Sequence, residues 1–583
     1  MKTLLLTFSL FFISSLQAKL NESCHLKNST GKQKHYICNI KNKNVHFLDI
    51  HGSMKDVAFY HGKFLETEVK DGVIKAVKKR KDESFAALSS SERKTYETVF
   101  KCVKSRYKRS LNKDFIEELE MLAKGANISK AEVIESTLMI EMSSFIDALD
   151  VKMKKNSKKA TLELISQCGL RLAGSSVKGF IKKLTKPFRK IKMGCTGFVA
   201  GGEYTQGDEF LHGRNFDTGF LGVFEKYPVI LRHTPNKGIP YIGMSSAGLH
   251  YSGGITGMNA KGISVSSHEL RTTKVRTLYS NRSGIIAPYM ANLIVKEAST
   301  LDEAIKLIKS HGHFGAWTFL ISDSKTGESA SVEVSGKIVR VAKRSFNKLS
   351  QANHFRHPDT AKFNFEYSIN KSLESRARIE HVNLGLESSK GSIDSQWGID
   401  LLSGHIDHYM GLRTFGRTVS KVYTSMSHVL DSKNNQLWFS LGESFPTNYS
   451  TFLGIEIDFK TKSKFFNFID AVKTKQSFRE QYPFFEEILR NYTLAYMNDR
   501  DFGQSVENLK ATRRILKDSL KVSDDNSFFD FSTTIMHARL GLKLFAKSRD
   551  QLVLLEVKND LESITALQLK RLHEYERSQV FRD

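Results

Sequence analysis

Residues 195–465 form the longest stretch of the chain with one structural character, because short strand-like runs alternate there with turn signals. The runs are rich in β-branched and aromatic residues, and turns such as NAKG, SKTGE and SKNNQ separate them. The runs are GFVAGG, PVILRH, GISVSS, TFLISDS, SASVEVSG, KIVRVAK, KVYTSMSHVLD, QLWFSLG and FLGIEIDF. Helical segments at 286–310 and 372–388 interrupt them, which predicts an α+β domain built from antiparallel hairpins.

The region before this stretch, residues 19–150, is predicted to be mostly helical after a short β-like start. The run FIEELEMLAKGANISKAEVIESTLMIEM has the periodicity of helices and a break at Gly125. Ser129 is the predicted N-cap of the following helix, and Glu132 three residues later completes a capping box.

The C-terminal region, residues 470–583, is also predicted to be helical. Apolar side chains recur there at i, i+4, i+7 and i+8, and FGQSVENLKATRRILKDSL continues the pattern as a helix pair. The first set is Ile488, Tyr492, Ala495 and Tyr496. We find no fixed period that would define a repeat protein.

Residues 151–194 form a basic linker between the N-terminal region, residues 19–150, and the strand-rich region, residues 195–465. They contain thirteen Lys and Arg residues against one acidic residue, Glu163, so their net charge is +12 of the total +26. Such a run is typical of a solvated loop, and the Leu, Ile and Phe residues at 180–188 leave a membrane-surface helix open. The charge favours an anionic partner, a membrane surface rather than nucleic acid in an exported protein.

The N-terminus has the features of a secretory signal peptide, residues 1–18. Lys2 supplies the charge, LLLTFSLFFI is the apolar core, and SSLQA ends at Ala18 as the cleavage site. We expect the mature protein to be exported, to the periplasm or the medium.

Five cysteines leave at least one thiol unpaired in an oxidising compartment. Cys24 can pair with Cys38 and Cys102 with Cys168, in which case Cys195 is the free thiol. Other pairings remain open, since four paired cysteines allow three connectivities.

The junction KMGCTGFVAGG is the candidate reactive site of the chain. Cleavage between Gly194 and Cys195 would give Cys195 a free α-amine, whose unperturbed pKa of about 7.7–8.0 suits a general base. One residue would then hold both nucleophile and base. Gly194 tolerates the turn that a self-cleaving bond requires. The alternative is that Cys195 is a small buried core residue.

The segment LHGRNFD supplies two candidate supporting residues. The fork of Arg214 can stabilise a thiolate, and Asp217 can accept hydrogen bonds from the terminal ammonium. Taken alone, the segment would be a hairpin with an ordinary ion pair.

The sequence CTGFVAGG…GDEFLHGRNFD resembles the start of the mature chain in N-terminal-nucleophile (Ntn) hydrolases of the choloylglycine hydrolase and penicillin V acylase group. It resembles the isopenicillin N acyltransferase (acyl-CoA:6-aminopenicillanic acid acyltransferase) family more closely. Further segments match that family in order over about residues 50–458. They are HGSMKDVAFYHGKFL, LEMLAKGANIS, GGITGMNAKGISV, FLISDSKTGESASVEVS, QANHF, SLESRARIEH and TVSKVYTSMSHVLDSKNNQLWFSLG.

The resemblance implies a four-layer αββα sandwich, self-cleavage before Cys195 and two chains that stay together. It implies that Cys195 is the nucleophile, that Arg214 and Asp217 support it, and that Asn353 of QANHF donates to the oxyanion, a contact worth roughly 3 kcal/mol. Asn259 of GMN is expected to be a turn residue. The family usually has Asn or a similar residue where this chain reads SSHEL, so the second oxyanion donor is not identified.

Histidines and acids gather in two short stretches, but neither has the spacing of a known zinc site. The stretches are GHIDHYMG, with His405, Asp407 and His408, and NHFRH, with His354 and His357. We therefore expect no metal and no cofactor.

The sequence thus predicts an exported, self-processing amidase or acyltransferase that acts on a small N-acyl substrate through an acyl-enzyme. The alternatives are a transferase that uses a thioester donor, and a secreted binding protein that docks on anionic envelope surfaces.

Overall fold

The computed structural model describes residues 23–138, 193–474 and 505–563, together with Ala495, apart from short gaps. The gaps are 41–42, 87–88, 219–222, 271–283, 337, 365–368, 408–411, 414–416, 442–445, 450, 462, 473 and 521–527. The predicted signal peptide and all but the last two residues of the basic linker therefore lie outside the described residues. No helix of the described part is both long and apolar enough to span a bilayer.

The described strands form two large antiparallel sheets with one parallel pair, and a small two-stranded ladder. The ten-stranded sheet has, in spatial order, β1 (Cys24–Thr30), β2 (Gln33–Ile40), β3 (Lys43–Gly52), β6 (Pro228–Pro235), β7 (Tyr241–Ser246), β8 (Thr256–Asn259), β9 (Ile263–Glu269), β10 (Ala316–Asp323), β11 (Glu328–Ser335) and β12 (Ile338–Phe346). The seven-stranded sheet has β13 (Lys348–Gln351), β4 (Met193–Gly201), β5 (Phe210–Thr218), β16 (Thr424–Asp431), β17 (Gln436–Ser440), β18 (Phe452–Ile457) and β19 (Phe466–Val472). Strands β14 (Ile406–Asp407) and β15 (Leu412–Arg413) pair with each other.

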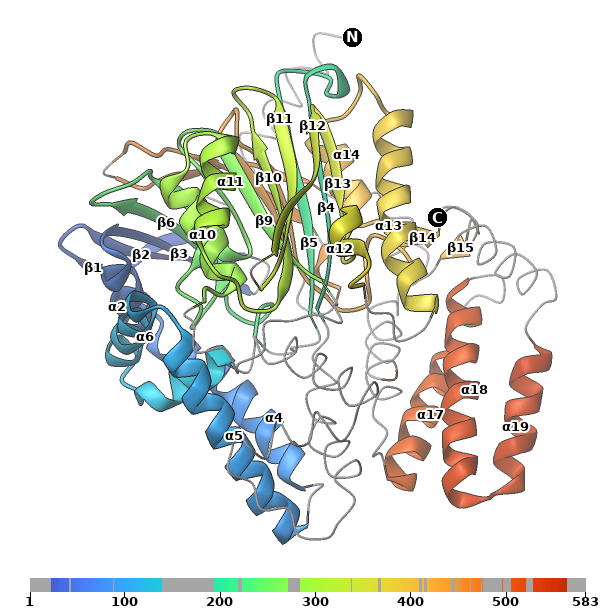
Figure 1. The fold of residues 1–583 in the computed structure, drawn as a ribbon. Coiled ribbons are helices and arrows are strands. Elements are labelled where there is room, and N and C mark those ends of the chain that lie inside the picture. The colour runs from blue at the N-terminus through green and yellow to red at the C-terminus, as the bar shows by residue number, and fades with distance from the viewer. Residues whose placement is uncertain are drawn as a thin grey trace.

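Helices cover the outer face of each large sheet (Figure 1). Helices α10 (Ala287–Glu297) and α11 (Leu301–Ser310) pack on the ten-stranded sheet, and α13 (Ile369–Ser388) and α14 (Ser395–Leu402) pack on the seven-stranded sheet. The short α12 (Pro358–Ala361) precedes α13. These layers confirm the predicted αββα sandwich.

The N-terminal region combines three strands with helices. Its helices are α2 (Met54–Phe64), α3 (Glu66–Val69), a π-helical turn (Lys70–Ile74), α4 (Lys75–Ala86), α5 (Ser90–Ser110), α6 (Lys113–Gly125) and a helix at 130–138. The Ser129 hydroxyl accepts from the Glu132 N–H, and the Glu132 carboxylate accepts from the Ser129 N–H at 3.0 Å, so the predicted capping box is present. The β-strand segment at the start of this region is longer than expected. It forms three strands, β1–β3, which are part of the ten-stranded sheet.

Glycines allow helices α2 and α6 to touch. A Cβ added to Gly125 would lie 2.0 Å from the Phe59 carbonyl oxygen, and one added to Gly62 would lie 2.5 Å from the Leu122 carbonyl oxygen. Any larger side chain would separate the two helices, which explains Gly62 of HGSMKDVAFYHGKFL and Gly125 of LEMLAKGANIS.

Strand β3 pairs in parallel with β6 and so joins the region before Cys195 to the region after it. At this seam Arg232 donates from Nε to Asp49 Oδ1 at 2.8 Å and from Nη2 to Asp49 Oδ2 at 2.7 Å, and both side chains are fully buried. Phe47 of β3 stacks on Phe466 of β19 with ring centroids 3.9 Å apart, which packs the N-terminal strand against the opposite sheet.

Buried polar side chains connect the two sheets behind the site. His212 of β5 is hydrogen-bonded through Nδ1 to Ser322 Oγ at 2.9 Å and through Nε2 to Ser266 Oγ at 2.8 Å. Ser266 Oγ in turn lies 3.0 Å from His268 Nε2. Burial lowers the pKa of His212 to about 3, so the ring is neutral at ordinary pH and fixes β5 over β9.

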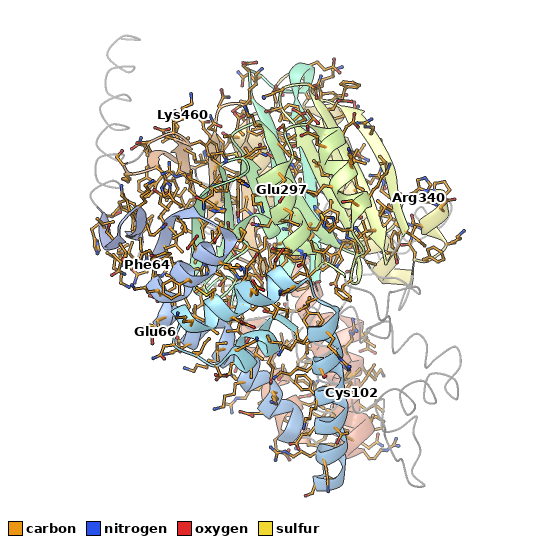
Figure 2. The ribbon with its side chains drawn as sticks, turned by 60° about the vertical axis from the view of Figure 1, so that its left-hand side comes forward. Phe64, Glu66, Cys102, Glu297, Arg340 and Lys460 are labelled. Atoms are coloured by element: carbon orange, nitrogen blue, oxygen red, sulfur yellow. A yellow bond between two sulfur atoms is a disulfide. The ribbon has the colours of Figure 1, made fainter. Side chains whose placement is uncertain are left out.

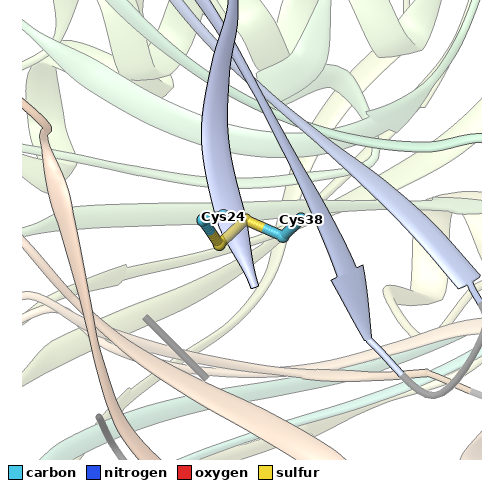
Figure 3. Close-up of a disulfide and its surroundings, with 2 residues drawn as sticks. All are labelled: Cys24 and Cys38. Atoms are coloured by element: carbon cyan, nitrogen blue, oxygen red, sulfur yellow. A yellow bond between two sulfur atoms is a disulfide. The ribbon is translucent and has the colours of Figure 1, made fainter. Parts of the chain in front are cut away.

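The observed state of the cysteines agrees in part with the pairing considered from the sequence. Cys24 and Cys38 form a disulfide between β1 and β2 (Figure 3), and Cys195 is a buried free thiol. Cys102 is also disulfide-bonded, and it lies on α5, which projects away from the sheets (Figure 2). Cys168, the remaining cysteine, lies outside the described residues.

The C-terminal region is helical as predicted, with α17 (Val506–Leu520), α18 (Phe528–Ser548) and α19 (Gln551–Glu562) side by side (Figure 1). Of the four apolar positions used for the prediction, Ala495 is described and is helical. Strand β19 extends the sandwich to Val472, past the predicted boundary at 465.

We expect Arg232→Met to lower the free energy of unfolding by about 3–5 kcal/mol, because it leaves the Asp49 carboxylate buried without its partner. Urea denaturation followed by tryptophan fluorescence measures the change. Arg344→Ala is the matched control, since Arg344 and Asp302 form an exposed ion pair worth about 0–1 kcal/mol. Equal losses in the two variants would contradict a special role for the buried pair.

Candidate active site

Cys195 lies in β4, between β5 and β13, and its side chain is completely buried. In the β4–β5 register Cys195 pairs with Phe216, and Gly194 pairs with Asp217. Side chains of paired residues share a face of the sheet, and neighbours along a strand alternate. Cys195 therefore faces the space between the sheets, whereas Asp217 lies on the face that the outer helices cover.

Arg214 lies against the thiol and is itself fully buried. Its Nη2 donates to Cys195 Sγ at 3.1 Å and also to the main-chain oxygen of Ser267. Its Nη1 donates to the Ile255 carbonyl and, at 3.3 Å, to Thr256 Oγ1. These contacts with the opposite sheet fix the guanidinium at the thiol, where its charge stabilises a thiolate.

Asn353 follows strand β13 and reaches the main chain of Cys195. Its Oδ1 accepts from the Cys195 N–H at 2.8 Å, and its Nδ2 donates to the Glu269 carbonyl at 2.8 Å. The side chain thus contacts the nitrogen that cleavage would convert into the α-amine. Its predicted role as oxyanion donor remains a prediction, and it requires Nδ2 to exchange the Glu269 carbonyl for the oxyanion.

Arg378 is a site residue to which the sequence motifs assigned no role. From helix α13 it donates to the Cys195 carbonyl at 2.5 Å, to Thr196 Oγ1 at 2.6 Å and to Asn353 Oδ1 at 2.8 Å. Its signal was present in SLESRARIEH, because Ser375 and Arg378 lie one turn apart. Ser375 Oγ accepts from the Asn353 N–H at 2.8 Å, so α13 holds Asn353 by both main chain and side chain.

Asp217 is fully buried and asymmetrically bonded. Its Oδ1 accepts from Thr424 Oγ1 at 2.7 Å, whereas its Oδ2 has no hydrogen-bond partner among the described residues. A Cβ added to Gly194 would lie 3.1 Å from Oδ2, so this oxygen faces Gly194. Burial raises the pKa of Asp217, and the charges of Arg378 and Lys421 oppose the rise.

Burial also raises the pKa of the Cys195 thiol in the intact chain. Arg214 lowers it and Asp217 raises it, and the balance stays above the ordinary value. The thiol of the intact chain is therefore neutral at ordinary pH until a base takes its proton.

The segment SSHEL contributes main-chain carbonyls to the site. The Ser267 carbonyl accepts from Arg214 and lies 3.9 Å from Cys195 Sγ, and the Glu269 carbonyl accepts from Asn353. The side chains of Ser266 and His268 belong to the polar connection between the sheets.

Asn259 is the last residue of β8 and bonds the turn into β9, in line with the expected turn role. Its Oδ1 accepts from the N–H groups of Lys261 and Ile263, and its Nδ2 donates to two carbonyls at the end of α10.

The histidines considered for zinc make separate local contacts. His354 Nδ1 is hydrogen-bonded to Ser375 Oγ, His357 caps α12, and His405 is hydrogen-bonded to the Ser403 carbonyl. His408 lies outside the described residues. Within the described part of the chain, no group of three or more His, Cys, Asp or Glu residues is arranged to hold a metal ion.

Comparison with known families adds a second line of evidence. Residues 204–443 match the acyl-coenzyme A:6-aminopenicillanic acid acyl-transferase family. The resemblance predicted from the sequence is therefore confirmed over this segment, and with it the enzyme class, a hydrolase or acyltransferase. The match includes Arg214, Asp217, Asn353 and Arg378, begins after Cys195 and ends before the C-terminal helices.

Three solved structures are similar to part of this chain. An N-acylethanolamine-hydrolyzing acid amidase ortholog of Caenorhabditis elegans is 17% identical and covers 41% of this chain and 93% of its own, with a TM-score of 0.29. A mutant of the conjugated bile acid hydrolase of Clostridium perfringens is 13% identical and covers 48% and 98%, with a TM-score of 0.31. Penicillin V acylase of Agrobacterium tumefaciens is 11% identical and covers 42% and 82%, with a TM-score of 0.27.

These TM-scores are low, so the fold assignment rests on the layers of the chain itself. A search of curated proteins finds no match.

We expect Arg378→Gln to reduce turnover of a chromogenic N-acyl amide on the order of 10²-fold, the scale seen when one preorganised donor is lost from an active site. The change removes the cation that contacts the Cys195 carbonyl and Asn353. Arg376→Gln, two residues away on the same helix but on another face, is the control and should retain activity within a few-fold. Similar losses in both variants, with unchanged melting curves, would refute a specific role for Arg378.

Proposed function

We propose that the protein is a self-processing cysteine amidohydrolase or acyltransferase, with Cys195 as nucleophile and its own α-amine as base. The observation that carries the proposal is that three polar side chains, two of them buried and that of Asn353 partly buried, contact Cys195 at three atoms. Asn353 accepts from its nitrogen, Arg214 donates to its sulfur and Arg378 donates to its carbonyl oxygen. A cysteine that merely fills the core needs none of these contacts.

Self-cleavage would begin with attack of Cys195 Sγ on the Gly194 carbonyl carbon. The C–N bond to Cys195 breaks, and the leaving nitrogen takes the proton that the thiol gives up. Asp217 Oδ2 faces Gly194, which supports a role for this carboxyl in giving a proton to the leaving nitrogen. Water then hydrolyses the thioester, which leaves a Gly194 carboxylate, a free thiol and the new α-amine.

The mature cycle would use the same groups on an N-acyl substrate. The α-amine, held by Asn353, takes the proton of the thiol while the sulfur attacks the amide carbonyl. Arg214 stabilises the developing negative charge at the sulfur, and the amine returns the proton to the leaving group. Water or a second amine then accepts the acyl group, and hydrolysis is our first expectation because acyl-CoA is scarce outside the cytoplasm.

The two chains are proposed to stay together after the cut. The parallel β3–β6 seam supports this, since it places strands from both chains in one sheet. A second buried contact supports it as well, because Glu118 of α6 accepts from Tyr289 at 2.6 Å and lies 2.9 Å from His250 Nε2. Removal of one chain would expose both groups of contacts to water.

We expect the purified wild-type protein to contain two polypeptides, the second of which begins at Cys195. Intact mass and N-terminal sequencing measure this directly. Cys195→Ala should leave one uncut chain, because the attacking sulfur is absent. A wild-type protein that remains a single chain, or is cut only within the lysine-rich linker, would overturn self-processing.

Export and an anionic surface partner are further proposals, and they rest on the sequence of 1–18 and 151–194. We expect the protein to co-sediment with anionic vesicles at 0.1 M salt and to be released at 1 M, since the screening length falls from about 10 Å to about 3 Å. The control replaces the linker lysines with glutamine. Equal binding of both proteins, or no binding at low salt, would show that the linker charge has no such partner.

A further inference from the structure

The segment Lys421–Thr424 determines which oxygen of Asp217 is available. The Lys421 N–H donates to Thr424 Oγ1 at 2.9 Å, and Thr424 Oγ1 donates to Asp217 Oδ1 at 2.7 Å. A hydroxyl has one proton, so a hydroxyl oxygen that accepts from an N–H directs its own proton to its other partner. Oδ1 is thereby committed as an acceptor, and any proton on the carboxyl resides on Oδ2.

Asp217 Oδ2 is the oxygen that faces Gly194, beside the bond proposed to be cut. It is buried and has no hydrogen-bond partner among the described residues. An unpaired buried carboxyl oxygen lowers the free energy of unfolding, and such oxygens occur where they take part in catalysis. The Thr424 hydroxyl therefore occupies Oδ1 and leaves the oxygen that faces Gly194 without a partner among the described residues.

The same segment is packed against the C-terminal helices. Val422 and Tyr423, between the two residues that hold the hydrogen bonds, are 0% and 4% exposed. They belong to one continuous buried apolar cluster with residues of the C-terminal region and Tyr449. The other members are Ala495, Leu509, Leu516, Met536, Leu540, Leu544 and Val553.

We propose that the helices α17–α19 are a positioning element for Asp217. The helices act on Asp217 through the segment Lys421–Thr424. The apolar cluster fixes Val422 and Tyr423, and these hold the residues on either side of them in the geometry of the hydrogen bond from the Lys421 N–H to Thr424 Oγ1. The inference rests on the proposed function of Cys195 and Asp217. It gives a role to a region that lies beyond the family match, which ends at residue 443.

The charges around Asp217 determine how its pKa changes when the Thr424 hydrogen bond is lost. Burial raises the pKa of Asp217. The charges of Arg378 from α13 and Lys421 from the segment lower it, as do the Thr424 hydroxyl and the charge of Arg214 from the same strand. Cys195 is the titratable neighbour on β4. Removal of the Thr424 hydrogen bond therefore raises the pKa of Asp217 further, and a pH limb that reports this carboxyl moves to higher pH.

The first experiment follows cleavage of the full chain during cell-free synthesis at pH 5–9. Thr424→Val should slow cleavage at least tenfold and move the pH limb upward, whereas Thr424→Ser, which keeps the hydroxyl, should restore both. Ser425→Ala is the matched control, because its hydroxyl bonds only to main-chain carbonyls among the described contacts. Wild-type rates and pH dependence in Thr424→Val would overturn the proposal.

The second experiment tests the helices at a distance from the site. Leu540→Ala in α18 opens a cavity in the cluster and should slow cleavage with the same upward shift of the pH limb. Leu542→Ala, two residues away and 50% exposed, should behave like the wild type. If the helices act through Thr424, the double variant Leu540→Ala/Thr424→Val will cleave no more slowly than Thr424→Val alone.

Fully additive effects in this double variant, or equal rates for Leu540→Ala and Leu542→Ala, would overturn the role of the helices. An uncut wild-type chain would instead refute the proposed function itself. Cys195→Ala supplies the uncut reference in both experiments.

Discussion

The antiparallel pairing of β4 with β5 and β13 is the constraint on which the site depends. It places Cys195 between the sheets beside Arg214, sets Gly194 opposite Asp217, and delivers Asn353 from the end of β13 to the Cys195 nitrogen. A shift of one residue would move Cys195 to the helix-covered face and break all these contacts at once. The polar connection from His212 to Ser266 and Ser322 opposes such a shift, because its hydrogen bonds require β5 to lie in one register over the other sheet.

Patterns within short segments of the sequence predicted the features that form between residues close together in the chain. Strand and turn signals predicted most hairpins of the sandwich, and the neighbouring motifs around Cys195 and Arg214 predicted residues that the register brings together. Strands β1–β3 extended further than their weak local signal suggested, since parallel pairing of β3 with β6 joins segments about 180 residues apart. Arg378 was not assigned a role, although SLESRARIEH places Ser375 and Arg378 one turn apart, because its contacts with Cys195 depend on how α13 packs.

The electrostatics of the site combine buried cations with the buried carboxyl of Asp217. Arg214, Arg378 and Lys421 surround Asp217 in a region with little water, where charges interact strongly. In the intact chain burial keeps the thiol neutral despite these cations. Cleavage would add an ammonium group next to Asp217 and a carboxylate at Gly194, so the same cations would then face a different charge balance. The intact and the processed protein would thus hold different protonation states with the same side chains.

Residues on both sides of the matched segment converge on Asp217. Gly194 and Cys195 approach it from before the segment, through the pairing of β4 with β5. The C-terminal helices approach it from after the segment, through the apolar cluster that contains Val422 and Tyr423. An added helical region that packed elsewhere on the sandwich would affect only stability. Because this one packs on the residues between Lys421 and Thr424, and the Thr424 hydroxyl binds Asp217, its packing is coupled to the geometry of Asp217.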